Sequence, residues 1–199
     1  MNQSKRATCL NYSRIRLQEG EPLLVMSASE VCFLRAEGAL RGWNMGGQTA
    51  QQYYEQGIRV SMEEKKATLG NYLSSTAHPA DYADYEQSYK YSAMSTVSPK
   101  WDTAAGFEEN LERIIIQKWI ATYPSGWETW ADIRRTGYPK FFPIVDNKSN
   151  STVSSSRGMR RLPFPESEKN TNTANVEAAV AMLEGSDTAA TDLWWAKKD

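Results

Sequence analysis

The sequence predicts a mainly α-helical fold that contains one antiparallel helix pair of the tetratricopeptide type, several short helices and long irregular loops. Two capping patterns, Ser27-x-x-Glu30 and Thr49-x-x-Gln52, stand directly before segments of helical character. In the second segment the apolar residues recur at i, i+3, i+4 and i+7, which is the spacing of one helix face. Between the predicted helices, long segments show no helical period. With 199 residues, the chain is predicted to form a single domain over 1–199.

Composition excludes several function classes. The formal net charge is -1 and the pI is about 6.0, so no basic surplus indicates a nucleic-acid partner. His78 is the only histidine, and Cys9 and Cys32 are the only cysteines, so the sequence predicts neither a metal site nor a Ser-His triad. Cys32 lies in an apolar run and is predicted to be buried. The chain contains no run of ~18 apolar residues, the length that a membrane-spanning helix needs.

The first elements are an extended lead-in over 1–26 and a helix pair over 27–66. A helix over 28–41 starts at Ser27 and ends before Gly42, a plausible C′ residue. A second helix over 49–66 carries Gly57 on its apolar face. Glycine costs ~1 kcal/mol relative to alanine inside a helix, so its position there predicts that another helix approaches closely. One such pair cannot bury both of its faces and is expected to have neighbours.

The next segment, 67–103, is rich in aromatic residues and is expected to be a long loop, a kind of segment that is often functional. Tyr82, Tyr85 and Trp101 are the candidate ligand-contacting residues, because exposed aromatic rings stack on the C–H faces of sugars. Nearby polar side chains that can bind hydroxyl groups are Asp81, Asp84 and Gln87. The alternative is that Tyr82, Tyr85 and Trp101 pack the loop onto the helices.

The remainder, 104–199, is predicted to combine helices with C-terminal loops. A helix over 104–122 presents Phe107, Leu111, Ile114, Ile115, Lys118, Trp119 and Thr122 on one face. A short helix follows Ser125 and ends near Gly137. Residues 140–173 are expected to be irregular, and a last short helix is expected to carry Val176, Ala179, Val180 and Leu183. Tryptophans are expected to be core or docking residues: Trp119, Trp127, Trp130, Trp194 and Trp195.

Charged side chains of the short helix have two possible roles. Arg134 or Arg135 is expected to pin the following Gly-Tyr-Pro turn to the body of the protein, since arginine pairs well with carboxylates; Arg160 and Arg161 are expected to act similarly. Glu128 and Asp132 lie four residues apart, and a glycosidase needs two carboxyl groups. Flanking arginines keep such acids ionised, which disfavours a general acid. Hydrolysis is therefore the weaker interpretation, and no catalytic residue is predicted.

Five segments in order resemble the C-terminal part of the SusD/RagB family of outer-membrane nutrient-binding lipoproteins. They are Ala28-Ser29-Glu30-Val31 with Tyr53-Tyr54-x-x-Gly57-Ile58; Gln117-Lys118-Trp119-Ile120-Ala121; Glu128-Thr129-Trp130 through Gly137-Tyr138-Pro139; Arg161-Leu162-Pro163-Phe164-Pro165-x-x-Glu168 with Asn172 and Asn175; and Thr191-x-Leu193-Trp194-Trp195. Any one of these motifs is weak evidence, whereas five in order over 27–199 are specific.

The resemblance implies a non-catalytic protein that binds an oligosaccharide or polysaccharide and passes it to a TonB-dependent outer-membrane transporter of the SusC type. It implies no cofactor. Family members are longer, begin with a lipoprotein signal and are lipid-anchored at the cell surface. Cys9 does not follow an apolar segment. We therefore expect a cloned fragment or a truncated gene product, soluble and without the anchor of its parent. The alternative function is a helical-repeat scaffold that binds a protein through the helix over 49–66.

Overall fold

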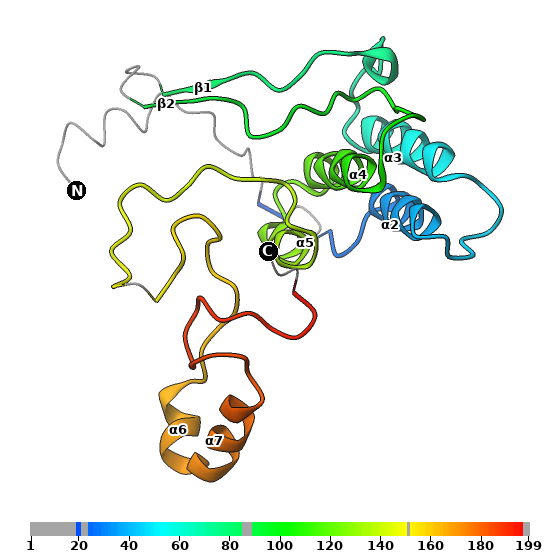
Figure 1. Cartoon of the computed structure of the whole chain (residues 1–199). Helices are drawn as coiled ribbons and strands as arrows, with labels where there is room; N and C mark the ends of the chain where they lie inside the picture. The colour runs from blue at the N-terminus through cyan, green and yellow to red at the C-terminus, as the bar shows by residue number, and fades with distance from the viewer. Residues whose placement is uncertain (1–18, 21–23, 85–88, 151, 197–199) are drawn as a thin grey trace. The chain divides into compact units, whose positions relative to one another are not determined.

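The computed structural model describes residues 19–20, 24–84, 89–150 and 152–196 (Figure 1). Most of the predicted lead-in over 1–26, together with Cys9, Tyr85 and Gln87, lies outside these residues. The chain divides into two compact units, Met1–Trp130 and Ala131–Asp199. The described residues are mainly α-helical, as the sequence predicted. That 1–199 forms a single domain stays a prediction.

The predicted helix pair is present as α2 (Ala28–Leu40) and α3 (Ala50–Glu64). The Ser27 hydroxyl accepts a hydrogen bond from the Glu30 amide at 3.1 Å and satisfies a donor that has no partner inside the helix. Thr49 and Gln52 form a complete capping box at the start of α3. Gly42, with φ 79°, follows the end of α2. Both predicted starts and the predicted C′ glycine are therefore confirmed.

Close packing of α2 on α3 depends on Gly57. A Cβ atom added there would lie 2.8 Å from Cε1 of Phe33, a side chain of α2 that is 1% exposed. Carbon atoms pack at about 3.5–4.0 Å, so any larger residue would collide with this ring. The close helix approach predicted from Gly57 is confirmed, and Phe33 is its partner.

The core of the first unit forms where α4 (Phe107–Thr122) joins the helix pair, and Figure 1 shows the three helices side by side. Among its buried residues are Phe33, Ala36, Tyr53, Tyr54, Ile58 and Ile114. A buried ion pair crosses the same interface: Lys118 Nζ lies 3.4 Å from Glu30 Oε1, and the two side chains are 3% and 7% exposed. Helix α4 is thus fixed to α2 by apolar packing and by charge.

The segment 67–103 contains more regular structure than the sequence predicted. It holds a short 3-10 helix, η1 (Tyr72–Ser74), and an antiparallel hairpin of β1 (Tyr82–Ala83) and β2 (Lys90–Tyr91). Elements of two or three residues are too short to give a readable period. The Tyr54 hydroxyl donates to the Pro99 carbonyl at 2.6 Å and holds the end of the segment on α3.

Helix α5 (Gly126–Thr136) ends as predicted, at Gly137 with φ 81°. In the second unit, the Thr136 hydroxyl accepts from the Tyr138 amide at 3.1 Å and so holds the Gly-Tyr-Pro turn. Arg135 pairs with Asp132 at 2.9 Å. The Thr136 hydroxyl thus supports this turn locally, and the role of Arg134 or Arg135 in pinning the turn to the body of the protein stays a prediction.

The second unit also contains α6 (Glu166–Thr171) and α7 (Thr173–Ala181). The expectation that 140–173 is irregular is therefore wrong for 166–171, because the helix-forming Glu-Ser-Glu-Lys follows Pro165 directly. The last helix ends before Leu183, which was expected to lie within it. The two helices pack on each other. Helix α6 contains no apolar residue, so it has no hydrophobic period by which the sequence could have indicated it.

Arginine–carboxylate pairs hold the second unit together. Arg160 and Arg134 each donate to the backbone carbonyl of the other, and Arg160 also pairs with Asp192 at 2.7 Å. Burial opposes ionisation of Asp192, but hydrogen bonds from Arg160 and Arg157 outweigh it and lower the pKa of this carboxyl. Arg161 pairs with Asp187. The predicted structural role of Arg160 and Arg161 is confirmed.

The prediction that the five tryptophans are core or docking residues is wrong, as to a place in the core, for three of them. Trp119, Trp127 and Trp194 are 42%, 70% and 89% exposed. Trp130 packs edge-on against Trp127, with ring centroids 5.7 Å apart, and the Arg134 guanidinium lies over the Trp195 ring. Phe107 is also exposed, and Cys32 is half-buried rather than buried. Among the described residues, no helix combines the length and apolar character that a membrane span requires.

Candidate ligand-binding pocket

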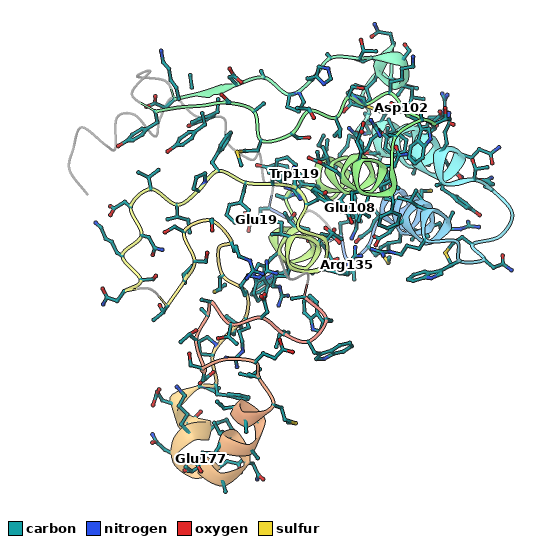
Figure 2. The ribbon with its side chains drawn as sticks, in the orientation of Figure 1. Glu19, Asp102, Glu108, Trp119, Arg135 and Glu177 are labelled. Atoms are coloured by element: carbon teal, nitrogen blue, oxygen red, sulfur yellow. The ribbon has the colours of Figure 1, made fainter. Side chains whose placement is uncertain are left out.

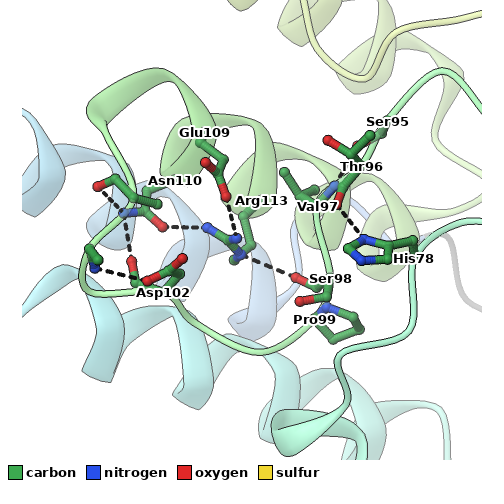
Figure 3. Close-up of polar contacts among 12 residues, drawn as sticks. His78, Ser95, Thr96, Val97, Ser98, Pro99, Asp102, Glu109, Asn110 and Arg113 are labelled. Carbon is green, nitrogen blue, oxygen red and sulfur yellow. Dashed lines mark hydrogen bonds and ion pairs between the residues drawn. The ribbon is translucent and has the colours of Figure 1, made fainter.

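A pocket of about 370 Å³ opens in the first unit, between α4 and two parts of the aromatic-rich segment, 72–79 and 97–99. This volume lies within the ordinary range of small-molecule sites. Its apolar wall, named so below, consists of Ala77, Pro79, Val97, Pro99, Ile116 and Ile120. Figure 3 shows the polar contacts of the surrounding segments.

Two polar side chains at the pocket hold each other in place. The Tyr72 hydroxyl lies 3.1 Å from Gln117 Oε1 and 3.0 Å from Gln117 Nε2. Gln117 comes from α4 and is 7% exposed. An amide group has two N–H donors and two acceptor lone pairs, so one bond to Tyr72 leaves further hydrogen-bonding capacity. The Tyr72–Gln117 pair is therefore a pre-oriented polar group beside the apolar wall.

Arg113 lines the pocket but brings no free positive charge to it. Its side chain is buried, and its Nη2 atom lies 3.0 Å from the Glu109 carboxylate. Its Nε donates to the Ser98 carbonyl at 3.1 Å, and its Nη1 donates to Asn110 (Figure 3). Arg113 thus fixes the 97–99 segment to α4, and its charge is compensated by Glu109.

His78 stands at the pocket with one tautomer fixed by its neighbour. The Nδ1 atom contacts the carbonyl oxygen of Thr96 (Figure 3). A carbonyl only accepts, so Nδ1 carries the hydrogen. In the neutral ring, Nε2 is then the acceptor, and it can take a hydrogen bond from a hydroxyl group.

The exposed indole of Trp119 lies on the pocket side of α4 (Figure 2). Ile116, Trp119 and Ile120 follow one another at i, i+3 and i+4, so they form a second apolar stripe on this helix. The sequence analysis assigned Trp119 to the first, buried stripe and missed the site. The spacing of these three residues was the signal that could have identified it.

The aromatic residues that the sequence analysis proposed as ligand contacts lie in different environments in the structure. Trp101 packs beside Tyr54, with ring centroids 5.2 Å apart, and contributes to the core, as the alternative interpretation expected. Tyr82 is 37% exposed and pairs with Tyr91 in the hairpin, which Figure 1 shows away from the helices of the first unit. Tyr85 lies outside the described residues. A ligand role for Tyr82, Tyr85 and Trp101 stays a prediction.

The acidic residues near Tyr82 support the hairpin itself. Asp84 is buried and its carboxylate accepts from the Tyr89 amide at 2.8 Å, while Asp81 accepts from the Ala93 amide at 2.9 Å. Both carboxylates therefore bind backbone donors of the opposite strand or its continuation.

The two carboxylates considered for hydrolysis each have a cationic neighbour. Glu128 lies 3.9 Å from Lys118 Nζ, and Asp132 pairs with Arg135. Within the described ranges, no three His, Cys, Asp or Glu side chains gather in a group that could hold a metal ion.

Comparison with known families identifies the class of protein. A model of the SusD-like family, described as SusD and RagB outer membrane lipoprotein, matches residues 1–196. The chain therefore belongs to the SusD/RagB family, as its five motifs indicated.

Solved structures of this family share its fold. A SusD homologue from Bacteroides uniformis is 47% identical, with a TM-score of 0.89 over 94% of this chain and 40% of its own. A SusD-like protein from Bacteroides thetaiotaomicron is 47% identical, with a TM-score of 0.83 over 90% and 38%. A chitin-binding SusD homologue from Flavobacterium johnsoniae is 44% identical, with a TM-score of 0.79 over 86% and 36%. The chain thus spans about two fifths of the length of these relatives. No curated protein matches it.

Proposed function

We propose that this chain contributes to the capture of a glycan without chemical turnover, and that the pocket beside α4 is its ligand site. Two findings support the proposal: the chain belongs to the SusD/RagB family, and one relative of 44% identity is described as chitin-binding. The observation that carries it is the exposed Trp119 ring beside the Tyr72–Gln117 pair. Such a ring stacks on the C–H face of a sugar, while neighbouring polar groups bind its hydroxyls.

We extend the proposal to the setting of the whole protein. The family description places its members in the outer membrane as lipoproteins. A glycan held at the cell surface must still cross that membrane. The family resemblance implies transfer to a TonB-dependent transporter of the SusC type, and we propose this transporter as the protein partner.

Incubation with a panel of oligosaccharides tests the proposal. We expect a retained glycan to be recovered intact, with no new reducing ends. Trp119→Ala should weaken retention about tenfold, because a buried aromatic contact contributes ~1.4 kcal/mol. Trp194→Ala removes a tryptophan that is 89% exposed in the other unit and should retain the glycan like the parent chain.

Affinity electrophoresis measures retention, and circular dichroism confirms that each variant is folded. Release of reducing ends would contradict the non-catalytic assignment. Unchanged retention by Trp119→Ala would show that the site lies elsewhere on the chain. The double replacement of Tyr82 and Tyr85 by alanine, which leaves the core residue Trp101 in place, then tests the aromatic segment.

A further inference from the structure

The pocket beside α4 has a composition that is unusual for a site that binds only hydroxyl groups. Its apolar wall supplies six residues, among them Ile116 and Ile120 of the second stripe on α4. A plain hexose places hydroxyl groups around its ring, so one face stacks on Trp119 while several hydroxyls are left against hydrocarbon. Burying a hydroxyl without a partner is unfavourable. A sugar with an apolar substituent fits this wall better.

The Tyr72–Gln117 pair indicates which functional groups that substituent should carry. Gln117 is fixed by Tyr72, and its amide still has an N–H donor and an acceptor lone pair. An acetamido group offers one N–H, one carbonyl and one methyl group. The Gln117 amide can therefore pair with the carbonyl or N–H of the substituent while its methyl group contacts the apolar wall.

Charge at the pocket points to a neutral ligand. Arg113 is compensated by Glu109, and apart from the His78 imidazole the other pocket residues discussed above have uncharged side chains. A uronate or sulfate group would lose its water without gaining a free cation, and the amine of a deacetylated sugar would lose its water without gaining a carboxylate. The pocket therefore disfavours both kinds of charged sugar.

We infer that the pocket recognises a neutral N-acetylated hexosamine unit, with its ring on Trp119 and its acetamido group between Gln117 and the apolar wall. This inference rests on the proposed glycan-binding function and adds the chemical class of the sugar. Buried methyl groups contribute ~0.8 kcal/mol each, which is about fourfold in affinity. An amide hydrogen bond that contributes ~0.5 kcal/mol, the lower end of the usual range, raises the expected preference to about tenfold.

Three trisaccharides of matched backbone test this inference by isothermal titration calorimetry. N,N′,N″-Triacetylchitotriose, called chitotriose below, carries acetamido groups; cellotriose carries hydroxyl groups in their place, and the glucosamine trimer of chitosan carries amines. Chitotriose is expected to bind about tenfold more tightly than each of the other two. Gln117→Leu keeps the approximate volume of the side chain and removes its amide, so it should reduce this preference to about fourfold, the part that the methyl contact alone contributes. Trp194→Ala is the matched control and should keep the full preference.

Each outcome has a separate meaning. Equal affinity for chitotriose and cellotriose would overturn this inference and leave glycan capture standing. A preference for chitotriose that Gln117→Leu does not change would also overturn it, because the amide would then lie outside the site. If the folded chain binds none of the three but retains another glycan from the panel, only the sugar class is wrong. If it retains no glycan at all, the proposed function fails as well.

Discussion

Replacing Lys118 by methionine is expected to destabilise the first unit by about 3–5 kcal/mol, the usual effect of removing one partner of a buried ion pair. Lys118 lies 3.4 Å from Glu30 at the interface of α2 and α4, and both side chains are almost completely buried. The substitution leaves the Glu30 carboxylate away from water and without its cation. Chemical denaturation at neutral pH measures the loss.

A double variant distinguishes the loss of the ion pair from the loss of side-chain packing. The double variant Glu30→Met/Lys118→Met removes both charges, so it is expected to lose clearly less than Lys118→Met alone. Lys148→Met provides the control, since Lys148 and Asp146 form a pair whose side chains are 82% and 76% exposed. That variant should unfold like the parent chain. A double variant as unstable as the single one would show that Lys118 acts through packing.

The same ion pair has a predictable dependence on pH. Burial raises the pKa of Glu30 above its ordinary value of 4.5, and Lys118 opposes this shift. A carboxyl whose pKa is higher in the folded state binds its proton more tightly there. Its contribution to stability therefore falls as the pH rises from about 4.5 through the raised value. The penalty of Lys118→Met should accordingly shrink as the pH is lowered through that range.

Gly57→Ala is expected to destabilise the helix pair by about 1–2 kcal/mol, although alanine favours helices by ~1 kcal/mol over glycine. The added Cβ would lie 2.8–3.0 Å from three carbon atoms of the Phe33 ring. Phe33 is 1% exposed and surrounded by the core, so the ring cannot move away freely. Thermal unfolding followed by circular dichroism measures the change.

Two further variants make this prediction specific. Gly126→Ala introduces a Cβ at the start of α5, where no heavy atom lies within 4 Å, and should be neutral or stabilising. Phe33→Leu shortens the opposing side chain, so Gly57→Ala should cost less in that background than in the parent chain. If Gly57→Ala stabilises the parent chain as Gly126→Ala does, close packing of α2 on α3 is not the reason for the glycine.

The helix pair was predictable because its signals are local. Ser27, Thr49 and Gly42 act on backbone groups within a few residues of themselves, so their effect is visible in the sequence. The same holds for Gly57, whose position on an apolar face already implied a close neighbour. Its partner Phe33 was not predictable, because it depends on how the two helices cross.

The site was predictable only in part, because it is made by residues distant in sequence. The segment 67–103 was proposed as a ligand site because it contains many aromatic residues. One of them, Trp101, instead packs on Tyr54, a residue almost fifty positions earlier in the sequence. Gln117 and Tyr72 meet across a similar separation. The exposed stripe that contains Trp119 has a helical spacing that the sequence shows. When a helix has two apolar stripes, however, the sequence alone does not show which of the two is buried. Only the packing of α4 on α2 decides that.

Hydrogen–deuterium exchange with and without a retained glycan tests the central claim most directly, since it locates the bound sugar on the chain. The account predicts that the glycan slows exchange in 72–78, 97–98 and 113–120, the segments that line the pocket beside α4. Slower exchange confined to the β1–β2 hairpin or to the second unit would contradict it.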